Sequence, residues 1–240
     1  MKTLGILGGM GPLAGAYFYM RIIENTPATR DGEHIPVLLC GIPQIPDRTE
    51  HLLGLGASPL GAMTDGIARL EAAGAEVIAI PCNTAHAFMA ELRDRSTLPI
   101  LDMPWECVSR ACEDGARRLG ILSTRGTRLS GVFDAAAHGV GAEVLYPSEE
   151  SGIAVEMLIY RQKRGEALTP QEYRPFICEL YERGADAIVL GCTEISVAFA
   201  GRRSAGIYDA LESLAQAAVQ VCIGKNGAGE KDAVFEAIAR

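Results

Sequence analysis

Short apolar runs alternate along the chain with longer segments of helical spacing. The runs TLGILGG, PVLLCG, EVIAIPC and LPILD lie in the first half, and RRLGILS, GAEVLYP, DAIVLGC and AGIYD follow in the second. Runs of this length predict buried strands, and apolar residues every three or four positions predict helices. The helices are expected over 13–25, 58–73, 105–116, 127–138, 149–164, 170–183 and 209–222, with Gly74 and Gly184 as helix stops. This alternation is typical of parallel sheets covered by helices on both faces.

The two halves of the chain repeat each other. LEAAGAEVIAIPCNT aligns without gaps with LYERGADAIVLGCTE, at the spacing that separates Cys82 from Cys192, and LGIL recurs at 4–7 and 119–122. We therefore predict an α/β protein of two similar three-layer α/β/α domains with parallel sheets, related by pseudo-two-fold symmetry. The domains are expected over 1–103 and 104–210, with C-terminal helices in 211–240 packing back on the first. The final segment, KNGAGEKDAVFEAIAR, is expected to form a flexible joint and a terminal helix.

Cys82 and Cys192 end equivalent predicted strands. Ligands of open parallel sheets bind beyond the carboxyl ends of the strands, so facing halves would place both thiols on opposite sides of one cleft. A thiolate on one side can remove a proton from a carbon acid while a thiol on the other side delivers one. The polar residues of CNTAH and CTEIS, with N–H groups at a helix start, can receive a carboxylate and stabilise the enolate. The pair predicts inversion at a carbon centre; a redox pair is the alternative and needs Cα atoms within about 7 Å.

The composition of the chain argues against several classes of binding partner. A formal charge of −8, without a basic block at either end, argues against nucleic acid and anionic membranes as partners. We find neither a signal peptide nor a run of about 20 apolar residues that would span a membrane, so we expect a cytoplasmic protein. The absence of a CxxC pair and the four scattered histidines argue against a metal site. The remaining cysteines are expected to be core residues: Cys40, Cys107, Cys112, Cys178 and Cys222.

Two further segments carry candidate binding residues. The loop GILGGMGPLAG does not match the spacing of a dinucleotide fingerprint, but its glycines allow close backbone approach to a small ligand, with Met10 as an apolar contact. Arg48 lies in a proline-rich loop after the second strand, where it could clamp a carboxylate. Arg161, Lys163 and Arg164 lie near a helix end, where cations also interact with the helix dipole.

The motifs GILGGMGP, IPDRT, PCNTAH, KRG and GCTEI, in this order, resemble those of the cofactor-independent aspartate/glutamate racemase superfamily. The resemblance covers essentially the whole chain and is to the aspartate racemase branch. Glutamate racemases carry a histidine where this chain has Glu194, and a D-S-G in the first loop, which this chain lacks. The resemblance implies a pyridoxal-free racemase with no cofactor and no metal, usually a homodimer, with the active site between two domains.

The resemblance also implies roles for particular residues. Cys82 and Cys192 would be the two bases, and the residues that bind the α-carboxylate would be Asn83, Thr84 and Thr193. Arg48 and Lys163 would grip carboxylates, although a one-residue shift would exchange Lys163 for Arg164, and Met10 would line the pocket. Glu194 could tune Cys192, orient the substrate ammonium, or favour a helix start. His86 is expected to be a structural hydrogen-bonding residue.

These observations favour a small-molecule amino-acid substrate, with interconversion of L- and D-aspartate as the expected reaction. A broad-specificity racemase acting on glutamate or other amino acids, or a hydantoin racemase, is the nearest alternative. A maleate-isomerase-like reaction would make the two cysteines unequal, because one thiol would add to the substrate. A binding protein that has kept the cleft without turnover is the alternative from a different class, and it has no need of two thiols.

Overall fold

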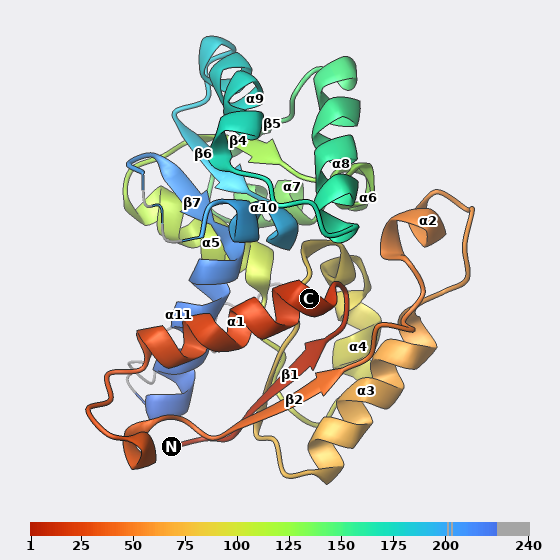
Figure 1. Cartoon of the computed structure of the whole chain (residues 1–240), viewed down its shortest axis with the longest axis vertical. Coiled ribbons are helices and arrows are strands. Elements are labelled where there is room, and N and C mark those ends of the chain that lie inside the picture. The colour runs from red at the N-terminus through yellow and green to blue at the C-terminus, as the bar shows by residue number, and fades with distance from the viewer. Residues whose placement is uncertain (201, 203, 225–240) are drawn as a thin grey trace.

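The computed structural model describes residues 1–200, 202 and 204–224 (Figure 1). The predicted joint and terminal helix over 225–240 lie outside the described residues. The strands are β1 (Leu4–Gly8), β2 (Val37–Gly41), β3 (Val77–Ala79), β4 (Arg118–Leu122), β5 (Glu143–Leu145), β6 (Ala187–Leu190) and β7 (Ile207–Asp209). The longer helices are α1 (Pro12–Asn25), α3 (Leu60–Ala72), α5 (Met103–Glu113), α8 (Glu149–Lys163), α9 (Pro170–Glu182) and α11 (Ala210–Ile223). The shorter helices are η1 (Asp31–Glu33), α2 (Arg48–Leu52), η2 (Asn83–Phe88), α4 (Met89–Arg95), α6 (Arg125–Ser130), α7 (Val132–Gly139) and α10 (Thr193–Ala198).

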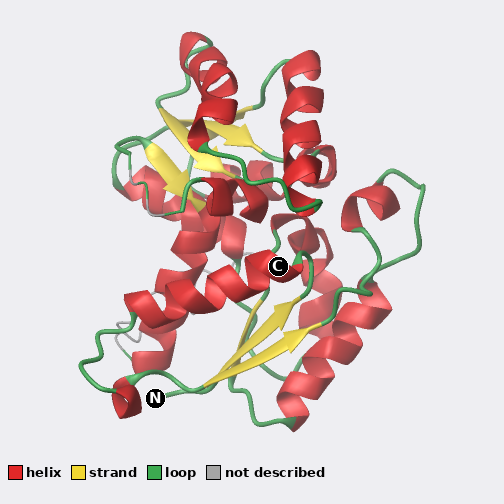
Figure 2. Ribbon diagram, viewed as in Figure 1, coloured by secondary structure: helices red, strands yellow, loops and turns green. Residues whose placement is uncertain are grey.

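The strands form two parallel sheets, one from each half of the chain. Their orders are β2-β1-β3 and β5-β4-β6-β7, so the first strand of each half lies between the second and the third. Apart from the exposed Arg118 at the start of β4, the central strands consist of apolar and small residues and are buried, because helices cover both faces (Figure 2). Helices α3 and α1 pack on opposite faces of the first sheet, and α9 and α7 cover the second. The predicted fold class is confirmed.

Two predicted elements differ in the structure. The helix expected over 127–138 is two helices, α6 and α7, because Gly131 adopts a left-handed conformation with φ of 67° and ends the first of them. The strand expected at LPILD forms only an isolated bridge between Ile100 and Ile78. Pro99 has no N–H to extend that ladder, and Asp102 already caps the next helix, α5. The short helices α2 and α4 were not predicted, and η2 and α10 were expected only as helix starts after Cys82 and Cys192.

Helix α11 connects the two halves. It packs against α1 from the first half and against α5, and a single hydrophobic core contains residues of β1, β4, α5 and α11 (Figure 1). The domain boundary at 103/104 stays a prediction. Among the described residues, no helix combines the length and the apolar character that crossing a membrane requires.

Candidate active site

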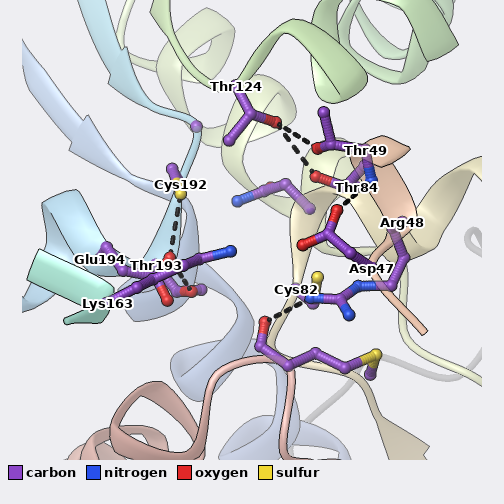
Figure 3. Close-up of a pocket in the computed structure, with 13 residues that line it drawn as sticks. Asp47, Arg48, Thr49, Cys82, Thr84, Thr124, Lys163, Cys192, Thr193 and Glu194 are labelled. Carbon is purple, nitrogen blue, oxygen red and sulfur yellow. Dashed lines mark hydrogen bonds between the residues drawn. The ribbon is translucent and has the colours of Figure 1, made fainter. Parts of the chain in front are cut away.

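A pocket lies between the two halves, at the carboxyl ends of β1, β3, β4 and β6 (Figure 3). Every residue singled out for the site from the sequence lines it: Met10, Arg48, Cys82, Asn83, Thr84, Lys163, Cys192, Thr193 and Glu194. The structure adds four residues to this lining, which are Asp47, Thr49, Thr124 and Gly191. Parallel strands of both sheets therefore direct their polar ends into one space.

The two cysteines hold equivalent places in this pocket. Cys82 precedes η2 and Cys192 precedes α10, and both have extended backbone before the chain turns into the helix. The two residues are 6% and 8% exposed and both thiols are free. Figure 3 shows their sulfur atoms on opposite sides of the pocket. This is the arrangement that the repeat predicts.

The surroundings of Cys192 are acidic. Its thiol donates a hydrogen bond to Glu194 Oε2 at 3.1 Å, and the hydroxyl of Thr193 donates to the same oxygen at 3.3 Å. Burial, together with the negative charge of Glu194, raises the pKa of the Cys192 thiol well above its ordinary value. Cys192 is therefore held as a neutral thiol.

The surroundings of Cys82 are basic. The Arg48 guanidinium is buried beside Cys82, and it donates hydrogen bonds to the carbonyl oxygens of Pro46 at 3.0 Å and Met10 at 3.3 Å (Figure 3). Burial opposes the charge of Arg48, but interaction with Cys82 and the Asp47 carboxylate outweighs it and raises the pKa of Arg48. The guanidinium thus places a positive charge beside this thiol.

Lys163 is the second cation of the pocket. It stands in the last turn of α8, and Figure 3 shows its ammonium group directed between Glu194 and the first half of the chain. Burial opposes this charge, but the pKa of Lys163 is raised above its ordinary value, chiefly by the carboxylate of Glu194. Arg164 does not line the pocket, and its side chain is 66% exposed near Glu166. The geometry thus selects Lys163 over its neighbour.

Several polar side-chain atoms in this region are buried and have no hydrogen-bond partner among the described residues. Within the described part of the chain, neither amide atom of Asn83 has a hydrogen-bond partner, and Arg48 Nε also lacks one. Buried polar groups without partners are costly and rare, and they are found where a ligand completes the hydrogen bonding. Asn83 and Arg48 therefore offer donors and an acceptor to a small polar ligand.

A network of threonine hydroxyl groups joins the two halves beside the pocket. Thr84 from the first half bonds Thr127 from the second at 2.7 Å, and Thr124 lies within 3.4 Å of both Thr84 and Thr49. Thr84, which was predicted to bind a carboxylate, thus has its hydroxyl group engaged in this network. Thr124 lies two residues after the end of β4, so the rule that ligands bind at strand ends was sufficient to find it.

Helices α2 and α6 meet at a glycine in this network. A Cβ atom at Gly126 would lie 2.4 Å from Thr49 Oγ1 and 2.7 Å from Thr49 Cα. Only glycine therefore allows the two helices to approach this closely, and α2 begins with Arg48. The contact fixes the position of Arg48 over Cys82.

We expect Gly126→Ala to lower kcat/KM about tenfold or more, because displacement of α2 by a fraction of an ångström moves Arg48. The control is Gly61→Ala in α3, where an added Cβ meets nothing within 4 Å. Steady-state kinetics and thermal unfolding of both variants test this expectation. Unchanged activity in Gly126→Ala would show that the contact does not position the site.

Among the described residues, no group of three or more His, Cys, Asp or Glu side chains is placed to hold a metal ion. The ionisable side chains that line the pocket are two cations, two carboxylates and two thiols.

Comparison with known proteins agrees with this geometry. The chain is 25% identical over 200 residues to a broad-specificity amino-acid racemase, RacX, of Bacillus subtilis, a match that covers 80% of this chain and 86% of that protein. The structure of this chain resembles that of Picrophilus torridus aspartate racemase, with a TM-score of 0.81 and 28% identity over 92% of this chain and 94% of that one. It shares the fold of an aspartate racemase homologue from Pyrococcus horikoshii, with a TM-score of 0.74 and 22% identity over 93% of this chain and 100% of that one. The Asp/Glu/hydantoin racemase family matches residues 7–221, and the chain belongs to that family.

Proposed function

We propose that the protein is a cofactor-independent racemase that interconverts L- and D-aspartate, with Cys82 and Cys192 as its two bases. The observation that carries this proposal is the pair of buried, free thiols on opposite sides of one pocket that also holds two cations. Binding alone needs no such pair of acids and bases.

The two cations support a dicarboxylic amino acid as the substrate. Arg48 and Lys163 come from different halves of the chain and line the same pocket, so each can take one carboxylate. The amide of Asn83, which has no hydrogen-bond partner among the described residues, lines the same pocket and can supply further hydrogen bonds. Met10 supplies an apolar wall. The two cations also stabilise the enolate that forms during the reaction.

The reaction proceeds through two proton transfers. One thiolate removes the Cα proton, and the electron pair of the broken C–H bond moves onto the α-carboxylate to give an enediolate. The opposite thiol then donates its proton to the other face of Cα, which forms the enantiomer and leaves a thiolate on that side. Because Glu194 favours the neutral form of Cys192, this thiol is ready to donate a proton in the resting pocket.

We expect Glu194→Gln to lower the pKa of the Cys192 thiol, because the substitution removes the negative charge that stabilises the protonated form. The pH at which iodoacetamide begins to alkylate Cys192, followed by peptide mass spectrometry, should therefore decrease. Cys178, which was expected in the core but is exposed in the structure and does not line the pocket, is the internal reference in the same digest. An unchanged alkylation profile at Cys192 would contradict the assigned role of Glu194.

Proton exchange tests the proposed function directly. The purified protein in heavy water, without added pyridoxal, receives L-aspartate and then D-aspartate, and NMR follows the loss of the Cα proton. Exchange together with inversion from both enantiomers is the expected result. If neither enantiomer exchanges, aspartate racemisation is excluded, and a panel of other amino acids and hydantoins then tests the wider family activity.

A broad-specificity amino-acid racemase is the second candidate, and the similarity to the Bacillus subtilis protein favours it. The two candidate functions are distinguished by the ratio of kcat/KM for aspartate to kcat/KM for monocarboxylic amino acids such as alanine. A high ratio supports the dicarboxylate assignment, and a ratio near one supports broad specificity. The homodimeric state and the cytoplasmic location remain predictions that sedimentation and cell fractionation would test.

A further inference from the structure

His86 and Ser196 hold equivalent places behind the two thiols. Each stands four residues after its cysteine, and the repeat that aligns Cys82 with Cys192 also aligns these two residues. They are 5% and 0% exposed, and neither lines the pocket. Both are polar groups in the interior, so each requires hydrogen-bond partners.

His86 joins Cys82 to the start of α5. Its Nδ1 lies 2.9 Å from the carbonyl oxygen of Cys82, and its Nε2 accepts a hydrogen bond from the Met103 N–H at 3.0 Å. Burial lowers the pKa of His86, which keeps the ring neutral. A neutral ring that accepts at Nε2 carries its proton on Nδ1, so Nδ1 donates to Cys82. The imidazole is thus a rigid link between Cys82 and Met103, the first residue of α5.

Ser196 joins the region of Cys192 to the start of α11. Its hydroxyl donates to Asp209 Oδ1 at 2.6 Å and lies 3.5 Å from the Cys192 carbonyl oxygen, to which its N–H donates at 3.2 Å. The same Asp209 oxygen caps α11 by accepting from Leu211 N at 2.9 Å. The second half therefore repeats the link of the first with different side chains.

Both links end on helices that pack against each other, because α5 contacts α11 directly. Through these two links, the backbones of both cysteines are held against the same pair of packed helices in the core. Proton transfer from opposite faces of a small substrate requires that each sulfur be held at a fixed distance from Cα, and errors of about 1 Å can cost 10²-fold in rate. Rigid links of this kind meet that requirement.

We propose that His86 and Ser196 are positioning residues, one for each thiol, which hold the backbones of Cys82 and Cys192 against the starts of α5 and α11. The proposal rests on the proposed two-base racemisation. Loss of either link impairs proton transfer at its own thiol and leaves the other thiol in place.

Kinetic isotope effects distinguish this role from a general structural one. Because the two enantiomers have equal free energies, any variant lowers kcat/KM equally in both directions. The effect of deuterium at Cα on kcat/KM is different, because it reports only how far the first proton transfer limits the rate. Impairing one thiol raises the isotope effect for the enantiomer that this thiol deprotonates and lowers it for the other, where the same thiol acts in the second step.

The experiment uses the full chain with L- and D-aspartate, each protonated or deuterated at Cα. The variants are His86→Gln and Ser196→Ala, and the matched control is Ser213→Ala, which removes a buried hydroxyl that donates to the Asp209 carbonyl at 2.9 Å. Circular dichroism and thermal unfolding establish that each variant is folded. Assays at about pH 8 keep Asp209 ionised, because burial raises its pKa to about 6.

We expect both variants to lower kcat/KM about tenfold or more, with isotope effects that change in opposite directions for the two enantiomers. The enantiomer whose isotope effect rises in His86→Gln should be the one whose isotope effect falls in Ser196→Ala. Ser213→Ala should leave both isotope effects at their original values. If His86→Gln does not fold, Ser196→Ala alone tests the proposal, because it must still change the two isotope effects in opposite directions.

Equal changes for both enantiomers, or no change, in a folded variant would overturn the positioning role. This outcome is distinct from failure of the proposed function, since the unmodified protein must first interconvert the two enantiomers of aspartate. Without that activity the two-base reaction itself is excluded, whatever the variants show.

Discussion

Substitution of either Cys82 or Cys192 by serine is expected to abolish racemisation, with a decrease in kcat/KM of about 10³-fold or more. A serine hydroxyl is a far weaker acid than a thiol, whose free pKa is about 8.5, so it is not ionised as a base at neutral pH. Each enantiomer needs one residue as the base and the other as the acid. Loss of one thiol therefore stops both directions.

Polarimetry and Cα proton exchange in heavy water measure this loss. Cys178→Ser is the matched control, because Cys178 is exposed and does not line the pocket. Racemisation at the original rate in either pocket variant would contradict the two-base mechanism. A large loss in one variant with little loss in the other would instead favour a reaction in which a single thiol adds to the substrate.

Lys163→Met is expected to lower kcat/KM for aspartate by about 30-fold to 10³-fold, corresponding to about 2–4 kcal/mol for loss of a desolvated charged partner. Methionine keeps the length of the aliphatic stem and removes the ammonium that lines the pocket beside Glu194. A substrate carboxylate then loses its cation, and the acidic residues around it remain. Arg164→Met is the neighbouring control and should change kcat/KM by less than about twofold, as is usual for exposed charges.

Alanine as an alternative substrate shows whether this effect comes from a carboxylate clamp. It lacks the β-carboxylate, so Lys163→Met should reduce its kcat/KM much less than that of aspartate. An equal reduction for both substrates would indicate that Lys163 supports the thiols or the fold rather than the second carboxylate. Equal behaviour of the Lys163 and Arg164 variants would remove the basis for assigning Lys163 to the site.

The strands and longer helices were predictable because their signals are local. The run LGILG is long enough and apolar enough to be a buried strand wherever it packs, and residues 4–8 form one. The break at Gly131 and the single bridge at Ile100 were not predictable in the same way. A glycine within a helical pattern is compatible with continuation or with a left-handed turn, and packing decides between them.

The site was predictable to the extent that it lies at strand ends. Met10, Cys82 and Cys192 each follow a strand, and the repeat pairs the two thiols by register alone. Asp47 and Thr49 were missed because they belong to a short helix without a periodic signal, α2, which reaches the pocket by packing on α6. That contact joins residues far apart in the sequence.

The sequence by itself determined that this protein has two related α/β halves and that one thiol ends an equivalent strand in each, because both facts depend on repeated local patterns. Only the tertiary structure decided that Lys163 rather than Arg164 enters the pocket, since adjacent residues on a helix point in different directions. It also decided that Cys82 lies beside Arg48 and Cys192 beside Glu194. Thiols that are equivalent in the repeat thus have different neighbours in the folded protein, because packing brings together residues that are far apart in the sequence.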